Sequence, residues 1–149
     1  MTRCTIQFSI FLASKPGVLS RLCDSLAHDK INIIAMSMMD STEHGVFRMI
    51  AEDEKQARKT LGRLNLPTAE TEVIVMELPN RPGALADVCA RLGTNHVGIN
   101  YAYCTGSAPN GRSLAVLKVS DLKKGLKTLE SRKPRRRAAA TVRPRRRRV

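Results

Sequence analysis

The sequence predicts an α+β protein built from two similar units, each with an antiparallel sheet, followed by a basic C-terminal segment of different character. Three observations carry this prediction: one stretch is written twice, apolar residues alternate between strand and helix periods, and most of the positive charge lies at the C-terminus. A repeat at a fixed period defines the structural unit, so it decides how the other elements are grouped.

The repeated stretch reads KPGVLSRLCDSLAHDKINIIAMSM at residues 15–38 and RPGALADVCARLGTNHVGINYAYC at residues 81–104. At an offset of 66 positions the shared residues are Pro16/Pro82, Gly17/Gly83, Leu19/Leu85, Cys23/Cys89, Leu26/Leu92 and Ile33/Ile99. Two copies indicate tandem modules rather than a solenoid, which needs at least about three repeats. The predicted divisions are a first module at 1–68, a second module at 69–131 and a tail at 132–149.

Each copy begins with a strand, a turn and a helix. In the first copy, alternate apolar residues from Ile6 to Leu12 predict a strand with one buried face. Pro16 suits the first helical position, because its φ is fixed and it has no N–H to leave unsatisfied. The apolar stripe of the helix falls at helical spacing, as Leu19, Leu22, Cys23 and Leu26 in the first copy and Leu85, Val88, Cys89 and Leu92 in the second.

The remaining elements follow in the same order in both copies. In residues 31–39 both the odd-numbered and the even-numbered positions are largely apolar. This is typical of a strand covered on both faces or lying at an interface. A turn, a strand from Gly45, a helix at 54–64 and a linker at 65–71 come next, and the linker has room for one very short strand. The second copy continues with strands at 72–78, 97–104 and 113–119 and helices at 82–94 and 121–130. This order is that of a ferredoxin-like fold. No convincing fourth strand follows Glu130; residues 138–143 could supply one, and without it the second module has an exposed or swapped edge.

The sulfur-containing residues indicate structure rather than chemistry. The four cysteines form no Cys-x-x-Cys pair and have no histidine at zinc-ligand spacing, so we expect no metal and no cofactor. They are interpreted as small core residues in a reducing compartment. A soft apolar cluster, Met36, Met38 and Met39, is interpreted as core or dimer interface.

The two Pro-Gly turns are the candidate binding feature. A glycine at the start of a helix leaves the first backbone N–H groups open to close approach. These groups carry the positive end of the helix dipole, so the place attracts a carboxylate or a phosphate. The alternative is that Gly17 and Gly83 only allow a tight turn between strand and helix.

The tail differs from the rest of the chain. Residues 132–149 contain ten Lys or Arg residues and no acid, which leaves only +3 of the formal +13 for residues 1–131. A block of like charge without an apolar pattern is expected to be disordered. It is interpreted either as a binder of nucleic acid or another polyanion, or as a solvated extension without a partner.

Several function classes are disfavoured. The sequence has no nucleophile elbow, no P-loop lysine and no metal cluster, so we expect no enzyme and no catalytic residues. It has no secretory signal and no apolar run of transmembrane length, so no membrane contact is expected and the predicted location is the cytoplasm.

The segments LPNRPGALADVCARLGTNHVGIN at 78–100 and FLASKPGVLSRLCDSLAHDKINI at 11–33 resemble the ACT domain, a small regulatory module that binds amino acids. NYAYC at 100–104 is similar to that family's second strand. The resemblance covers about residues 4–130 and is to the stand-alone tandem ACT-domain proteins. It implies two βαββαβ modules, paired so that a ligand lies between the turn of one module and a strand of its neighbour.

The resemblance also implies which residues bind. In the second copy they are Asn80, Arg81, Pro82, Gly83, Ala84 and Leu85, facing Asn100 or Tyr101 of a paired strand. In the first copy they are Ser14, Lys15, Gly17, Val18 and Leu19, with Ser14 in place of the asparagine. An asparagine amide both donates and accepts hydrogen bonds, which suits a zwitterionic amino acid. The second copy is therefore the better candidate.

The sequence thus leads to three functional hypotheses. The first is an allosteric regulatory protein that binds a free amino acid and acts as a homodimer. The second is a protein that binds nucleic acid or another polyanion through its Arg-rich tail. The third is a regulatory subunit of an amino-acid biosynthetic enzyme.

Overall fold

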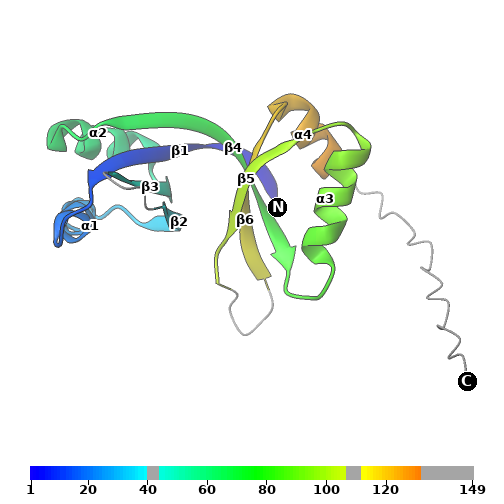
Figure 1. The fold of residues 1–149 in the computed structure, drawn as a ribbon, viewed down its shortest axis with the longest axis horizontal. Helices are drawn as coiled ribbons and strands as arrows, with labels where there is room; N and C mark the ends of the chain where they lie inside the picture. The colour runs from blue at the N-terminus through cyan, green and yellow to red at the C-terminus, as the bar shows by residue number, and fades with distance from the viewer. Residues whose placement is uncertain (40–43, 107–111, 132–149) are drawn as a thin grey trace, which may run out of the picture.

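The computed structural model of the chain describes residues 1–39, 44–106 and 112–131. Six strands form one antiparallel sheet in the order β2-β3-β1-β4-β6-β5. Helices α1 and α2 lie at one end of the molecule and α3 and α4 at the other, with the strands between them (Figure 1). The predicted α+β class with two ferredoxin-like modules is confirmed. The predicted disorder of 132–149 and the possible strand at 138–143 lie outside the described residues.

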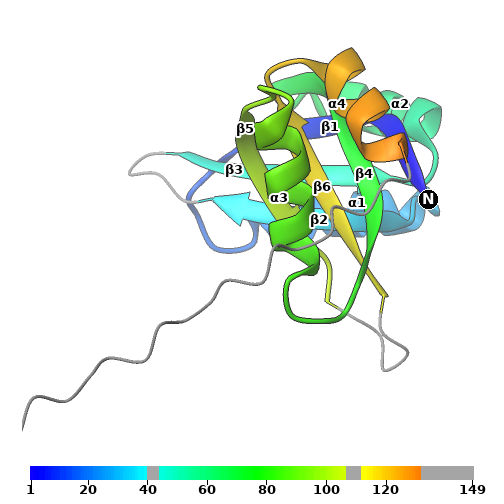
Figure 2. The same ribbon diagram turned by 90° about the vertical axis from the view of Figure 1, so that its right-hand side faces the viewer.

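The elements of the first module are β1 (Thr2–Ala13), α1 (Val18–His28), β2 (Ile33–Met39), β3 (His44–Ala51) and α2 (Glu54–Leu64). Those of the second are β4 (Thr68–Pro79), α3 (Ala84–Thr94), β5 (Ile99–Cys104), β6 (Arg112–Val119) and α4 (Leu122–Glu130). In the view of Figure 2, α3 and α4 lie in front of the strands of the second module. The module boundary at 68/69 stays a prediction.

The two long strands β1 and β4 each serve both modules. They pair antiparallel from Thr2↔Met76 to Ile10↔Thr68. In addition, β1 pairs with β3 from Phe8 onwards and β4 pairs with β6 from Ile74 onwards. The first half of β1 therefore takes the place of the fourth strand in the second module, and the first half of β4 does so in the first module. The linker predicted at 65–71, with room for one very short strand, ends before Thr68, because pairing with β1 makes residues from Thr68 onwards part of the long strand β4.

Three apolar clusters hold this arrangement together. One lies between the sheet and helices α1 and α2, around Phe8, Leu22 and Phe47. A second lies between the sheet and helices α3 and α4, around Ile74 and Leu92. The third contains strand residues alone, from both modules: Ala35, Ile50, Val73, Val75 and Val116. The face of the sheet that carries no helices is therefore folded so that its two halves, one from each module, pack against each other. We call this buried surface the inner face.

The sulfur-containing residues differ from the expectation. Cys89 is exposed and Cys23 half-buried, because the buried stripe of α3 runs through Ala84, Val88 and Leu92 instead. The side chains of Met36, Met38 and Met39 are 47, 46 and 53% exposed, since β2 is an edge strand. They therefore lie outside the core of the chain. None of the helices in the described part of the chain is long and apolar enough to span a bilayer.

Candidate ligand-binding site

The two Pro-Gly turns have the same backbone conformation. Gly17 and Gly83 precede their helices in the left-handed region, with φ/ψ of 84/−9° and 86/−8°. Glycine adopts this region without steric cost, whereas other residues rarely do. The prediction that a proline occupies the first helical position is wrong, because the left-handed glycine delays each helix to the residue after it. The backbone of the turn thus requires a glycine whether or not a ligand binds there. This was the alternative explanation for the repeated glycine.

The helices that follow these turns lack the caps of the other two. No side chain caps α1 or α3, whereas Asp53 accepts a 2.9 Å hydrogen bond from Gln56 N at the start of α2. Asp121 accepts an equivalent bond of 2.9 Å from Lys124 N at the start of α4. A Cβ added at Gly17 would meet no atom within 4 Å, so the space beside it is open. A ligand carboxylate can therefore take the place that an aspartate holds in α2 and α4.

The residues of the second turn that were predicted to bind a ligand lie close together. Asn80, Arg81, Pro82 and Leu85 are exposed, while Ala84 is buried beneath them. The Arg81 guanidinium pairs with Asp87 in the first turn of α3, with a distance of 3.1 Å between Nη2 and Oδ2. The guanidinium is thereby held beside the start of the helix. The apolar side chain of Leu85 is 44% exposed next to it.

The first turn has the same shape with a different charge. Ser14, Lys15 and Gly17 are exposed, and Val18 and Leu19 are half-buried. Arg21 stands at the position of Asp87, and α1 has no acid in its first turn. Among the described residues, neither Lys15 nor Arg21 has an ion-pair partner. The first turn is therefore the more positive of the two.

Within one chain, Asn100 and Tyr101 do not meet the second turn. Pro79 pairs with Arg112 at one end of the β4–β6 ladder, whereas Tyr101 pairs with Lys118 towards the other end of β6. Asn100 is exposed on the edge strand β5. The predicted meeting of turn and strand would have to come from a second copy of the chain, and it stays a prediction.

The side chain of Tyr101 instead belongs to a polar cluster on the inner face, which sequence reasoning missed. Its Oη accepts a 2.7 Å hydrogen bond from Gln7 Nε2, and its ring lies 4.4 Å from the Arg48 guanidinium carbon. Tyr103 Oη donates to Gln7 Oε1 at 3.0 Å, and burial raises the pKa of Tyr103 above its ordinary value. No local sequence signal reveals this cluster, because β5 meets β1 and β3 only through the packing of one module on the other.

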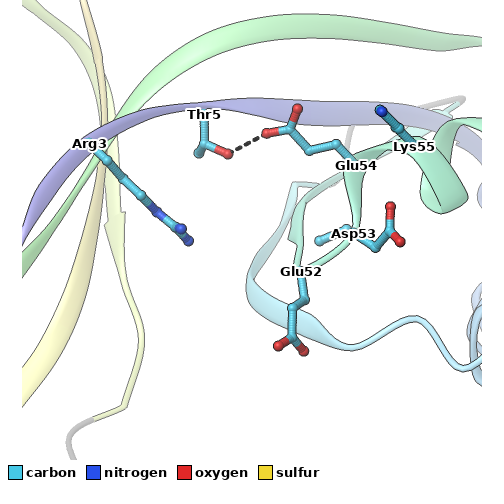
Figure 3. A pocket seen from close by; sticks show the side chains of 7 residues that line it. Arg3, Thr5, Glu52, Asp53, Glu54 and Lys55 are labelled. Carbon is cyan, nitrogen blue, oxygen red and sulfur yellow. Dashed lines mark hydrogen bonds between the residues drawn. The ribbon is translucent and has the colours of Figure 1, made fainter.

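A hollow of about 400 Å³ lies between the start of β1 and the start of α2, and Figure 3 shows the residues that line it. Its three carboxylates have internal partners. Glu54 accepts from Thr5 Oγ1 at 2.6 Å and from Ile6 N, Asp53 caps α2, and Glu52 accepts from the amide of Asn32. No group of three potential metal ligands occurs in the described ranges. We therefore assign the hollow a structural role, since Glu54 joins the start of α2 to β1, Asp53 caps α2 and Glu52 joins the end of β3 to Asn32.

The fold is a pair of ferredoxin-like modules. The candidate site occurs once in each module, at the helix N-terminus that a left-handed glycine precedes. The chain belongs to the ACT domain pair family, whose model matches residues 3–125. The crystal structure of protein BT0572 from Bacteroides thetaiotaomicron is similar, with 31% identity and a TM-score of 0.80 over 86% of this chain and 88% of that one. No curated protein sequence matches the chain.

Two more distant structures share the fold. The ligand-free regulatory subunit of aspartate kinase from Thermus thermophilus is 10% identical, with a TM-score of 0.59 over 86% of this chain and 93% of that one. The regulatory subunit of aspartate kinase from Thermus flavus is 12% identical, with a TM-score of 0.59 over 86% and 94%. At these identities the likeness concerns the fold alone.

Proposed function

We propose that this chain is a regulatory protein, without catalytic activity of its own, that binds a free amino acid at the Pro-Gly turns. The observation that carries the proposal is the contrast between the helices: α2 and α4 start on an aspartate, whereas α1 and α3 start on a left-handed glycine without a side-chain cap. The ligand carboxylate binds at that bare helix start. Asn80 and Arg81 supply further polar groups at the second turn, and Ser14 and Lys15 do so at the first.

A homodimer would complete each site. Among the described strands, the outer two, β2 and β5, each have one edge without a pairing partner, and β5 carries the exposed Asn100. When β5 of one copy lies beside the second turn of another, Asn100 faces the ammonium group of the bound amino acid. Ligand binding then shifts the population of dimers, which is how the signal is passed on.

Isothermal titration calorimetry with each of the twenty amino acids tests this proposal. The full chain is compared with a chain that ends at Ser131 and with the Gly83→Val and Gly17→Val variants. We expect saturable binding of one or a few amino acids by both chains, and its loss at the substituted turn, because a β-branched residue is strained at positive φ. Absence of binding by all twenty, or binding that survives both substitutions, contradicts the proposal.

The regulated target is a separate matter. Distant structural neighbours are regulatory subunits of aspartate kinase, which supports a proposal that this chain regulates an amino-acid biosynthetic enzyme. Affinity capture with and without the bound amino acid tests it, and capture of the same enzyme in a ligand-dependent amount is the expected result. Capture that does not respond to the ligand contradicts regulation through the turns.

The tail supports a second candidate function, binding of nucleic acid or another polyanion. Its ten basic residues predict association that is independent of base sequence and falls steeply with salt. Fluorescence anisotropy with a labelled duplex, for the full chain and the chain ending at Ser131, separates the tail from the modules. Equal affinity of the two chains contradicts a role for the tail.

A further inference from the structure

The inner face of the first module carries two neighbouring rows of side chains near its open end. The strand register places Ser37 and Ser9 on either side of Arg48. Two residues further along the strands, Met39 and Phe11 lie on either side of Val46. We call these six residues the inner ledge. It lies on the face of the sheet opposite α1 and α2, because Phe47 and Met49, between and beside the rows, point into the helix-side core.

The apolar row of the ledge is uncovered. Phe11 is 42% exposed and Met39 is 53% exposed, and both are among the few large apolar side chains with such exposure. The deeper part of the same face is closed, since Gln7 is fully buried beside the tyrosines of β5. The ledge is therefore the open margin of a buried inter-module surface.

Beside the polar row, a cluster of one amide and three hydroxyls has hydrogens left to donate. Gln7, Ser9, Tyr101 and Tyr103 make three hydrogen bonds to one another: Gln7 Nε2 with Ser9 Oγ (3.2 Å), Gln7 Nε2 with Tyr101 Oη, and Tyr103 Oη with Gln7 Oε1. One side-chain amide and three hydroxyls carry five polar hydrogens, so two hydrogens stay without an acceptor among the described residues, whichever way the amide faces.

Arg48 adds to this excess. Its Nε is buried without a hydrogen-bond partner, and no carboxylate of the described residues lies within ion-pair distance of its guanidinium. One face of the guanidinium rests on Tyr101, and Nη1 contacts the Met39 sulfur at 2.7 Å. This half-buried cation has a thioether sulfur and an aromatic ring as its described contacts and no carboxylate, and its Nε has no partner, so it is complementary to an anion.

We propose that the inner ledge binds a small organic anion, a carboxylate with an apolar body. The carboxylate accepts hydrogen bonds from Arg48 and from the neighbouring hydroxyls, and the apolar body covers Phe11 and Met39. This site is separate from the Pro-Gly turns, which lead into the helices on the other face of the sheet, and it does not depend on the function proposed for them.

The chain provides its own probe for this site. It contains no tryptophan and only two tyrosines, Tyr101 and Tyr103, so its tyrosine emission comes entirely from the cluster beside Arg48. The experiment titrates the full chain with hexanoate, with hexanamide as the uncharged analogue and acetate as the carboxylate without an apolar body. We expect a saturable change in emission with hexanoate, with a Kd of about 1 mM or lower, and at least about tenfold weaker binding of the other two.

Substitutions then locate the binding. Arg48→Met should weaken hexanoate binding at least about tenfold, and Arg48→Lys, which keeps the charge but loses the planar fork, should weaken it less. Phe11→Ser should weaken hexanoate but leave acetate unchanged. The matched control is Arg3→Met, an exposed arginine on the same sheet, which should change nothing. Thermal melts by circular dichroism identify any variant that fails to fold. If Arg48→Met does not fold, the Arg48→Lys and Phe11→Ser variants test the proposal in its place.

Two results overturn the proposal. One is that the full chain, titrated with hexanoate, shows neither a change in tyrosine emission nor a heat of binding by isothermal titration calorimetry. The other is hexanoate binding that Arg48→Met leaves intact, which would place the anion on the basic tail or elsewhere. The double variant Gly17→Val/Gly83→Val separates this site from the turns: retained hexanoate binding supports the ledge, and lost binding assigns the anion to the turns instead.

Discussion

The two modules repeat one backbone turn with different side chains around it. Gly17 and Gly83 differ by only 2° in φ and 1° in ψ, as their values of 84/−9° and 86/−8° show. Around them, the second turn pairs Arg81 with Asp87, whereas the first has Lys15 and Arg21 and no acid. The comparison teaches that the two copies keep the same backbone turn before the helix, while the charge beside it differs.

The ends of the helices differ in the same way. In the first module, Asp29 at the end of α1 accepts hydrogen bonds from Thr60 Oγ1 at 2.5 Å and from Arg63 at 2.7 Å. In the second, Arg91 of α3 donates to the carbonyls of Thr128, Leu129 and Ser131 at the end of α4. An acid joins one helix pair and a base joins the other, so substitutions should affect the two modules differently.

The largest expected effect comes from breaking the strands that the modules share. A chain that begins at Phe8 lacks the segment of β1 that covers β4 from Thr71 to Met76. We expect the second module to lose its folded state, although all its own elements are present, because buried Ile74 and Val75 then lie beside an open edge. Circular dichroism melts and amide exchange measure this. The chain ending at Ser131 is the control, and an intact second module in the shortened chain contradicts the prediction.

The next effect separates the two helix pairs. Arg91→Met leaves carbonyls at the end of α4 without their charged donor and should lower the free energy of unfolding by about 2 kcal/mol. Arg63→Met breaks an exposed ion pair in the first module and should cost less than about 1 kcal/mol. Urea denaturation of both variants measures the difference. Equal losses in the free energy of unfolding would show that the hydrogen bonds of Arg91 stabilise the fold no more than an exposed ion pair does.

A smaller effect tests the identity of the two turns. Gly17→Ala and Gly83→Ala each place a Cβ at positive φ, which should cost about 1–2 kcal/mol per site. Because the backbone angles agree, the two losses in the free energy of unfolding should match within about 0.5 kcal/mol. A much larger loss at one site would show that its turn is held by contacts that the other lacks.

The smallest effect concerns pH. The hydrogen bond from Thr60, followed by the Arg63 charge, lowers the pKa of Asp29 in the folded chain. The carboxylate is thus favoured by folding, so its contribution is complete above the ordinary aspartate pKa of about 4 and is lost as the pH falls through the folded value. Asp29→Asn should make the free energy of unfolding less steep between about pH 5 and pH 3. An unchanged slope in urea titrations contradicts the assignment.

Local patterns predicted the local elements of this fold. The repeat, the strand before each turn and the helix after it were all visible in apolar spacing, because these features depend on neighbours in sequence. The starts of the two helices that follow the Pro-Gly turns were misplaced, since a left-handed glycine and a helical proline produce the same Pro-Gly letters. The turn residues Asn80 to Leu85 lie together as expected, because they are consecutive.

Features that depend on distant pairing were not predictable in this way. The exchange of β1 and β4 was left open, because no spacing tells a strand which partner completes it. Gln7 looks like an ordinary polar residue on a strand with one buried face, yet it is fully buried, because the second module covers the other face. The inner ledge lies at the margin of that covered surface, so it too appears only in three dimensions.

The pairing of Thr2 with Met76 has a consequence for synthesis on the ribosome. At about 5–20 residues per second, roughly 4–15 s pass between the addition of these two residues. Throughout that interval the first seven residues of the nascent chain have no strand to join, and the first module waits for the beginning of β4. The first module can therefore complete its sheet only after β4 has been made, so its folding cannot finish before synthesis of the second module has begun.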